Sequence, residues 1–206
     1  MLRVMVQCLA PTEVGRLGHG EAKMAQPAEK RWTVEEFLAW DDGTDRRYEL
    51  VDGQIVAMAP PSEGHGTIVA NLTIGIGRQL RTPCRVVGEA GVVPPDRDDT
   101  YHQADLLVTC SPPERGRSHP VDPVLIVEVL SPSTAVHDRG RKVEDYSRLP
   151  SVREILLVSS EERRVRYWRR EESRWIVEDL IDEAELRLET VPDPIPLTAI
   201  YEGSGV

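Results

Sequence analysis

The feature that most constrains this chain is an apolar, β-branched run at residues 123–131, PVLIVEVLS. A run of this length and composition is typical of a central β-strand covered on both faces. It is too short to cross a membrane, which takes about 20 apolar residues. The run is interrupted by Glu128. An ionised carboxylate is costly to remove from water unless it is paired or binds a metal, so Glu128 is the first candidate functional residue.

The segments after this run predict how the strand is connected. Residues 133–149 have the pattern of a helix that Pro150 ends, and residues 153–160 form a second apolar strand. A strand, a helix and a second strand in this order are typical of a crossover between parallel neighbours. We therefore expect an α/β (α+β) fold, in which helices flank a mixed β-sheet.

Local signals place the remaining elements. Thr33 and Glu36 fit the capping box of a short first helix that ends near Asp42-Gly43, and Ser62 precedes a second helical pattern. Asp52-Gly53 between two apolar runs predicts an N-terminal β-hairpin. Further strands are expected at 84–88, 91–94 and 102–110, and RVRYWRR with SRWIVEDLI predicts a C-terminal hairpin.

Length and charge limit the organisation of the chain. Its 206 residues, 40% hydrophobic and 29% charged, suffice for one domain that needs no disulfide or metal to be stable. We expect a loosely attached extension at 1–30, the folded domain at 31–182 and an acidic tail at 183–206. Residues 171–206 hold ten acidic and two basic residues, a balance of −8 out of the formal net charge of −10. This charge disfavours tight nonspecific DNA binding but permits a local basic cleft.

The three cysteines, Cys8, Cys84 and Cys110, are odd in number and have no metal-ligand spacing. We interpret them as reduced thiols of a cytoplasmic protein, with no disulfide framework and no membrane span.

Residues on a second strand and on the following helix extend the candidate site beyond Glu128. Asp105 begins an apolar strand in QADLLV, and Asp138, Lys142 and Tyr146 recur every four residues on one helix face. Each alone has an ordinary explanation, such as a strand-edge acid or an exposed Asp–Lys pair. Together, two carboxylates on neighbouring strands can hold Mg²⁺ or Mn²⁺, and an ammonium can orient water or stabilise charge on phosphorus. This is the minimum set for metal-assisted phosphodiester hydrolysis.

These residues lie in segments that resemble the Uma-two family of "putative restriction endonucleases", in the PD-(D/E)XK nuclease superfamily. The matching stretches are TVEEFLAW, YELVDGQIVAMAPPSEGHG, QADLLV, PVLIVEVLSPST and DRGRKVEDYSRLPSVREILLVS. They run from about Trp32 to Ser160, and a weaker pattern continues to about Leu180. The most specific part is VEVLSPST followed by D-x-x-x-K-x-x-x-Y.

The resemblance implies a restriction-endonuclease-like arrangement of the mixed β-sheet and its flanking helices, and a set of site residues. Asp105 corresponds to the metal-binding Asp of the family, and Glu128 corresponds to the acid of the (D/E)XK element. The residue two positions after Glu128 is a leucine, and the lysine has moved to the following helix, where Lys142 is the match. Glu49 corresponds to an acid that completes the site, and His65 corresponds to a histidine near it.

The activity implied by the resemblance is that of a Mg²⁺-dependent (or Mn²⁺-dependent) endodeoxyribonuclease that leaves a 5′-phosphate and a 3′-hydroxyl. Tyr146 is expected to orient Lys142, and the nucleic-acid partner is expected to be DNA. An enzyme that cuts both strands of a duplex would act as a homodimer. The chain has Ala104 where the family usually has proline, which leaves the metal-binding carboxylates in place.

Two other interpretations remain open. The chain could be a non-catalytic module that keeps the nuclease fold and binds nucleic acid or protein, which the acidic tail favours. It could also be a structural protein whose buried acids form salt bridges. The stretch RRVRYWRR interleaves arginines with aromatic residues, a pattern that can bind single-stranded nucleic acid, but a surface hairpin explains it more simply.

Overall fold

The computed structural model describes residues 30–117, 119–130 and 135–206, and for 135–139 it describes the backbone only. The predicted extension at 1–30 therefore lies, apart from Lys30, outside the described residues. The predicted helix start at 131–134 and the side chain of Asp138 lie outside them as well.

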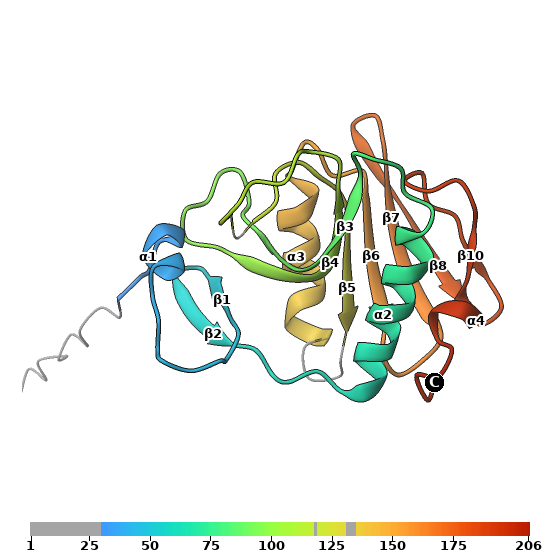
Figure 1. The fold of residues 1–206 in the computed structure, drawn as a ribbon, viewed down its shortest axis with the longest axis horizontal. Helices are drawn as coiled ribbons and strands as arrows, with labels where there is room; N and C mark the ends of the chain where they lie inside the picture. Colours follow the sequence, from blue (N-terminus) through green and yellow to red (C-terminus); the bar gives the residue numbers. More distant parts are fainter. Residues whose placement is uncertain (1–29, 118, 131–134) are drawn as a thin grey trace, which may run out of the picture.

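A six-stranded mixed sheet forms the centre of the protein, with the strand order β3-β4-β5-β6-β7-β8 (Figure 1). The strands are β3 (Arg85–Val92), β4 (His102–Thr109), β5 (Pro123–Leu130), β6 (Glu154–Ser159), β7 (Arg164–Glu171) and β8 (Arg174–Ile181). Strands β5 and β6 are parallel, and helix α3 (Ala135–Ser147) lies between them in the chain. The other pairs are antiparallel. The predicted crossover between parallel strands is confirmed.

The N-terminal part is a helix and a hairpin beside this sheet. Helix α1 (Val34–Leu38) has the predicted Thr33 capping box. Strands β1 (Tyr48–Val51) and β2 (Gln54–Ala57) pair through a turn at Asp52 and Gly53, both with positive φ, as a two-residue hairpin turn requires. Backbone hydrogen bonds of 2.9 and 2.8 Å between Leu50 and Tyr101 join β1 to the residue before β4.

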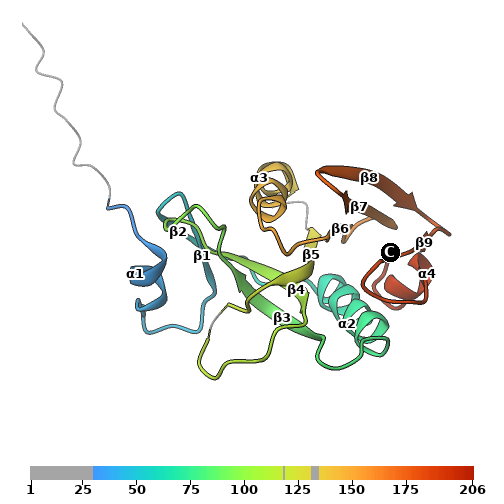
Figure 2. The same cartoon turned by 90° about the horizontal axis from the view of Figure 1, so that it is seen from above.

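Helices cover the two faces of the sheet unequally (Figure 2). Helix α2 (Glu63–Gly77), which Ser62 caps, lies on one face together with the C-terminal segment, and α3 lies on the other. Strand β5 shows why both faces are occupied: Leu125, Val127 and Val129 belong to the cluster under α2, and Ile126 belongs to the cluster under α3. Side chains alternate along a strand, so Glu128 faces α3.

The C-terminal segment is part of the core under α2. It consists of β9 (Glu185–Leu186), β10 (Ile195–Pro196) and α4 (Leu197–Ile200). Buried Glu154 fastens it to the sheet, because its carboxylate accepts hydrogen bonds from the backbone amides of Glu189 and Thr190 at 2.7 and 2.9 Å. Seven buried side chains of this segment join the cluster: Leu186, Leu188, Val191, Ile195, Leu197, Ile200 and Tyr201. The core thus continues past residue 182, where we had expected the domain to end and an acidic tail to begin.

The predicted fold class, a mixed sheet flanked by helices with a hairpin near each end, is confirmed. Two details differ. The strands expected at 84–88 and 91–94 are one continuous strand, β3, because Glu89 with positive φ interrupts the pairing without ending the strand. Helix α1 ends at Leu38, before the expected Asp42-Gly43.

The prediction that all cysteines are reduced is wrong for Cys84 and Cys110, which form a disulfide. The physical reason is the register of β3 and β4: Arg85 pairs with Thr109, so the residues just outside this pair face each other across the two strands. Sequence spacing alone gives no sign of this contact. Because these two cysteines are oxidised, they no longer support a cytoplasmic location. That location stays a prediction. Among the described residues, every helix is too short or too polar to cross a membrane.

Candidate active site

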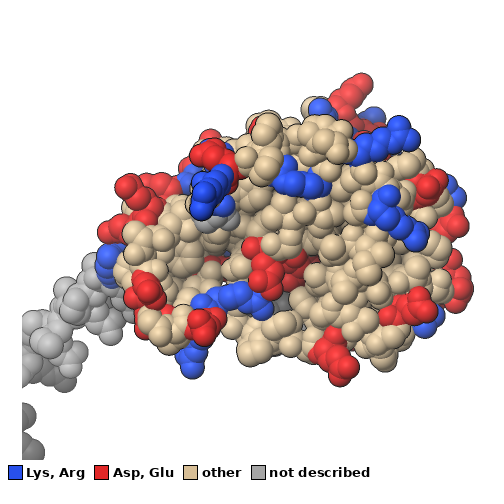
Figure 3. Space-filling model, viewed as in Figure 1, with Lys and Arg blue, Asp and Glu red and all other residues tan. Residues whose placement is uncertain are grey.

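The predicted site residues converge between the α3 face of the sheet, the β1–β2 hairpin and the start of α2. Leu106 pairs with Val127 across β4 and β5, so Asp105 and Glu128 come next along these two strands. Lys142 and Tyr146 reach the sheet from α3, one helical turn apart. In the space-filling view, acidic side chains gather near the middle of the face shown, with basic side chains around them (Figure 3).

Lys142 joins two buried carboxylates. Its ammonium nitrogen Nζ lies 3.3 Å from each carboxylate oxygen of Glu128 and 2.8 Å from Oε1 of Glu49. The three side chains are at most 10% exposed. Because both acids are withdrawn from water, this lysine is the buried positive charge that makes their ionised forms tolerable.

Tyr146 and the backbone of β4 hold the two carboxylates in place. The Tyr146 hydroxyl donates to Oε1 of Glu128 at 2.5 Å, so its contact is with the acid, whereas we expected it to orient Lys142. Oε1 of Glu49 accepts a hydrogen bond from the amide of Gln103 at 2.8 Å. This bond and the Leu50–Tyr101 pairing bring β1 to the sheet, and with it Glu49.

Asp105 occupies the other side of the site, next to β5. Its Oδ2 accepts a 2.7 Å hydrogen bond from the amide of Val129, the residue after Glu128. The same oxygen lies 3.3 Å from Nε2 of His65, which comes from the first turn of α2. Both side chains keep some access to solvent, 16% for Asp105 and 14% for His65. Asp105 is therefore fixed in place and still reachable by a ligand.

Glu128 is the most perturbed acid of the site. Burial raises its pKa from 4.5 to about 7, and the negative charges of Asp105 and Glu49 also raise it, while Lys142 and the Tyr146 hydroxyl lower it. The ion pair with Lys142 and the raised pKa look contradictory. Both hold because burial raises the pKa of Glu128 more than Lys142 lowers it. The single ammonium of Lys142 is shared between two acids, so its attraction for each is limited.

Two neighbours of Glu128 are perturbed in the same direction. Burial and the charge of Glu128 raise the pKa of the Tyr146 hydroxyl well above 10, so Tyr146 stays a hydrogen-bond donor at neutral pH. The hydrogen bond with Asp105 raises the pKa of His65 above 6.5, against the opposing effect of burial. Perturbed groups clustered in this way are characteristic of functional sites.

The chemistry of these donors fits a hard divalent cation. With their acids ionised, Glu49, Asp105 and Glu128 bring three negative charges and Lys142 one positive charge, which leaves an excess that a divalent cation would neutralise. Mg²⁺ commonly takes one or two protein carboxylates and completes its shell with water and phosphate oxygens. Among the described residues no cluster of three or more His, Cys, Asp or Glu is arranged to hold a metal alone. Asp105 and Glu128 supply the one or two carboxylates that such a cation commonly takes.

The candidate residues named from the sequence lie together in the structure, but sequence reasoning missed the layer behind them. Buried Nε2 of His102 lies 2.7 Å from Oδ2 of buried Asp145, and the His102 ring packs edge-on against the Tyr146 ring with centroids 5.6 Å apart. This pair ties β4 to α3 and so fixes Tyr146. No spacing links the two residues in the sequence; the one available signal was a histidine at the start of an apolar strand.

A restriction-endonuclease-like sheet that holds two adjacent-strand carboxylates and a helix lysine defines a class of nuclease-like proteins. The model of the Uma2 family, described as "Putative restriction endonuclease", matches residues 34–198 of this chain. The chain therefore belongs to the Uma2 family, as its sequence motifs predicted.

Comparison with known proteins agrees with this assignment. The chain is 30% identical over 172 residues to the uncharacterized protein slr1290 of Synechocystis sp., a match that covers 82% of this chain and 90% of that protein. It is 26% identical over 164 residues to sll1609 of the same organism, covering 73% of this chain and 88% of that protein. A crystal structure described as a "putative nuclease belonging to DUF820" from Anabaena variabilis superposes with a TM-score of 0.67 at 16% identity, over 82% of this chain and 97% of that one. This last likeness supports the fold.

Proposed function

We propose that this protein is a Mg²⁺-dependent (or Mn²⁺-dependent) endonuclease that hydrolyses phosphodiester bonds of DNA. The observation that carries the proposal is Glu128, an acid buried in an apolar central strand, bound to Lys142 on α3 and next to Asp105 on β4. A packed structural core has no need for this arrangement, because apolar residues of similar volume are often as stabilising as a buried ion pair.

Each side chain has a distinct task in this proposal. Asp105 and Glu128 would hold the cation, which supplies Lewis-acid polarisation of the phosphate and a more acidic bound water. Lys142, whose ammonium lies beside Glu128, would orient the attacking water and stabilise charge that builds on the phosphate oxygens. Tyr146 would keep Glu128 in its rotamer, and Glu49 would hold Lys142.

His65 is placed to assist Asp105. Its Nε2 lies beside Asp105 Oδ2, and its raised pKa favours a positive charge there. In the absence of a cation, this charge would balance the carboxylate. We therefore propose His65 as a positioning residue for Asp105, with no role in the bond-breaking step.

Cleavage assays on purified protein test the proposal. Labelled duplex and single-stranded DNA and RNA would be incubated with Mg²⁺, Mn²⁺ or EDTA, beside the variants Glu128→Gln and Lys142→Ala. We expect cleavage of DNA that requires the metal, that both substitutions abolish, and that leaves 5′-phosphate ends. Size-exclusion chromatography with and without duplex DNA would test the homodimer expected of an enzyme that cuts both strands.

Other outcomes point to different conclusions. Cleavage that is unchanged in both variants would place the chemistry elsewhere. Absence of cleavage, together with a melting temperature that does not respond to Mg²⁺ or Mn²⁺, would overturn the proposal and favour a non-catalytic binding module, because a ligand that binds the native state raises its stability.

A further inference from the structure

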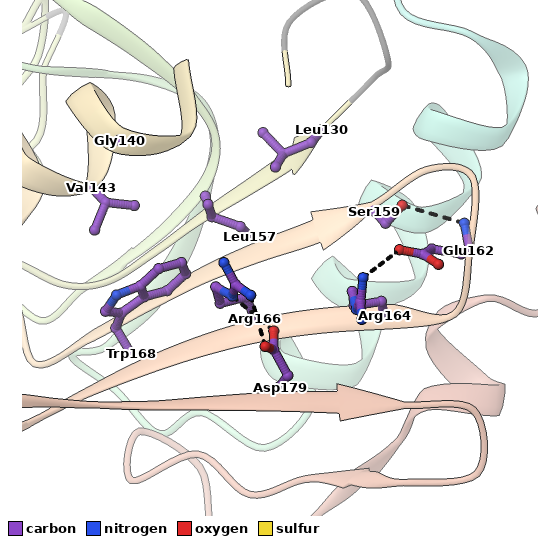
Figure 4. Close-up of a pocket in the computed structure, with 10 residues that line it drawn as sticks. All are labelled: Leu130, Gly140, Val143, Leu157, Ser159, Glu162, Arg164, Arg166, Trp168 and Asp179. Atoms are coloured by element: carbon purple, nitrogen blue, oxygen red, sulfur yellow. Dashed lines mark hydrogen bonds and ion pairs between the residues drawn. The ribbon is translucent and has the colours of Figure 1, made fainter. Parts of the chain in front are cut away.

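A cavity of about 300 Å³ opens on the α3 face of the sheet, beside the candidate active site (Figure 4). It lies where α3 stops covering the sheet and β7 and β8 continue. Its lining comes from β5, β6, β7, β8, the turn between β6 and β7, and α3: Leu130, Gly140, Val143, Leu157, Ser159, Glu162, Arg164, Arg166, Trp168 and Asp179.

Strand register connects this cavity to Glu128. Glu128 pairs with Leu157 of β6, Leu157 pairs with Arg166 of β7, and Arg166 pairs with Asp179 of β8. These four residues form one row across the sheet, with their side chains on the same face. Neighbouring strands lie about 4.8 Å apart, so the backbone of Arg166 is about 10 Å from that of Glu128. The cavity and Glu128 are therefore two strands apart on the same face of the sheet.

The cavity combines an apolar part with a charged part, in which two arginines are each paired with an acid. Leu130, Leu157 and Val143 line it together with the indole of Trp168, whereas Arg164 and Arg166 come from β7 with the same two-residue spacing as Trp168 (Figure 4). The sequence pattern favoured a plain surface hairpin for RRVRYWRR. The structure shows that alternate residues of this stretch line a cavity.

The two arginines are held in place with hydrogen-bonding capacity to spare. Arg166 uses Nε and Nη2 to bind the two oxygens of Asp179, each at 2.8 Å, and Arg164 uses Nη1 to bind Glu162 at 3.0 Å. A guanidinium has five N–H donors, so donors remain on both side chains. Both are about half exposed, 49% for Arg164 and 47% for Arg166, and can meet a ligand from solvent.

We propose that this cavity is a nucleotide subsite for the nucleic-acid strand that is cleaved at the active site. One base of the strand lies against Trp168 and the apolar lining, and its phosphate binds Arg164 and Arg166. The inference rests on the proposed function and deepens it, since it assigns a second contact to the same strand. A flat aromatic base attached to an anionic phosphate matches both halves of the cavity, whereas a purely apolar ligand would leave the arginines without a role.

Binding without cleavage tests this subsite. The anisotropy of a fluorescein-labelled single-stranded DNA oligonucleotide would be measured in EDTA for the wild-type protein, Trp168→Leu and Arg164→Ala. Arg187→Ala is the matched control, because Arg187 is also an exposed arginine paired with an acid two residues earlier, Glu185, and lies outside the cavity. Trp168→Phe keeps an aromatic ring and guards against a merely structural effect of losing the indole.

The subsite predicts different signatures for the two variants. Trp168→Leu loses stacking, so Kd rises about fivefold or more at every salt concentration, and Trp168→Phe retains most of the affinity. Arg164→Ala loses a phosphate contact, so the slope of log K against log salt becomes shallower by about 0.7. Arg187→Ala changes neither quantity.

The outcomes separate this inference from the proposed function. If the wild-type protein cleaves DNA but both cavity variants bind and cleave as it does, the subsite is overturned and the nuclease stands. If no form cleaves, yet the cavity variants bind the oligonucleotide as predicted, the nuclease proposal fails and the subsite stands. A wild-type protein that does not bind the oligonucleotide, or an Arg187→Ala effect equal to that of Arg164→Ala, overturns the subsite.

Discussion

The two faces of the central sheet differ in what they bury. Under α2, the strands and the C-terminal segment, which includes α4, enclose one large apolar cluster. Under α3, a smaller apolar cluster adjoins the buried set of Glu49, Glu128, Lys142 and Tyr146, and a cavity lies next to this cluster. Strand β5 serves both faces, with valines and a leucine toward α2 and Glu128 toward α3.

This difference separates stability from activity. Apolar burial supplies most of the folding free energy, so the α2 face can support the cost of burying charges on the α3 face. On the α3 face, the polar side chains of Glu128, Lys142 and Tyr146 are buried between the sheet and the helix. Substitutions on the two faces should therefore have different effects. Those on the α2 face should mainly change stability, and those on the α3 face should mainly change the proposed activity.

The largest expected effect on stability is on the α2 face, at Leu156. This residue of β6 is fully buried, so Leu156→Ala should lower the free energy of unfolding by about 2–5 kcal/mol through lost burial and a new cavity. Urea denaturation with an unchanged m-value would measure the loss. The cleavage rate per folded molecule should stay near that of the wild-type protein. A rate reduced as strongly as in Glu128→Gln would show that the faces are not separable.

Strand β5 and the helix after it could be predicted from the sequence because their signals are local. The apolar run has strand composition, and the four-residue spacing of Lys142 and Tyr146 fixes their common direction once a helix is assumed. An acid inside the run then has few inexpensive explanations. Its partner on β4, Asp105, stood out for the same reason.

Contacts between distant segments could not be predicted in this way. Cys84 and Cys110 meet because of the register of two strands, and Glu49 reaches Lys142 because β1 joins the start of β4. Neither contact leaves a periodic trace in the sequence. The short elements after residue 182 were missed because two-residue strands and a one-turn helix have no periodicity, and their burial depends on hydrogen bonds to Glu154.

The next largest effect is the pH dependence of the free energy of unfolding. It sharpens the contrast between the two faces, because Glu128 is buried on the α3 face. Its pKa is about 7 in the folded protein and 4.5 when unperturbed, so the folded state favours the protonated acid. The stability contributed by protonation is fully present below pH 4.5 and is lost as pH rises through about 7. At about 1.4 kcal/mol for each pKa unit, the loss approaches roughly 3 kcal/mol.

Comparing Glu128→Gln with the wild-type protein isolates this contribution. The variant cannot ionise at this position, so its stability relative to wild type should increase between pH 5 and pH 8 in urea denaturation. Other titrating groups are common to both proteins and largely cancel. A constant difference across this range would show that the pKa of Glu128 is not raised. Added Mg²⁺ should reduce the difference, because a bound cation stabilises the ionised acid.

A smaller effect is expected from Tyr146→Phe, which removes one hydrogen bond and keeps the buried ring. The lost bond to Glu128 should cost about 1.5–3 kcal/mol at pH 8, where the acid is ionised. Because this bond lowers the pKa of Glu128, its loss raises that pKa, and the pH of half-maximal cleavage should move upward. A pH–rate profile would measure the shift. A lower rate with an unmoved profile would assign Tyr146 a purely structural role.

The smallest effect compares glycines in the two flanking helices. A methyl group at Gly140 of α3 would meet no described atom within 4 Å, whereas at Gly75 of α2 it would contact Ile195 side-chain atoms at 3.5 and 3.6 Å. Alanine favours a helix over glycine by about 0.5–1 kcal/mol, so Gly140→Ala should stabilise the protein by that amount and no more. Gly75→Ala should gain this helix contribution and also a buried contact. Equal urea midpoints for the two variants would show that the α3 face is packed as closely as the α2 face. This result would contradict the presence of the cavity beside the active site.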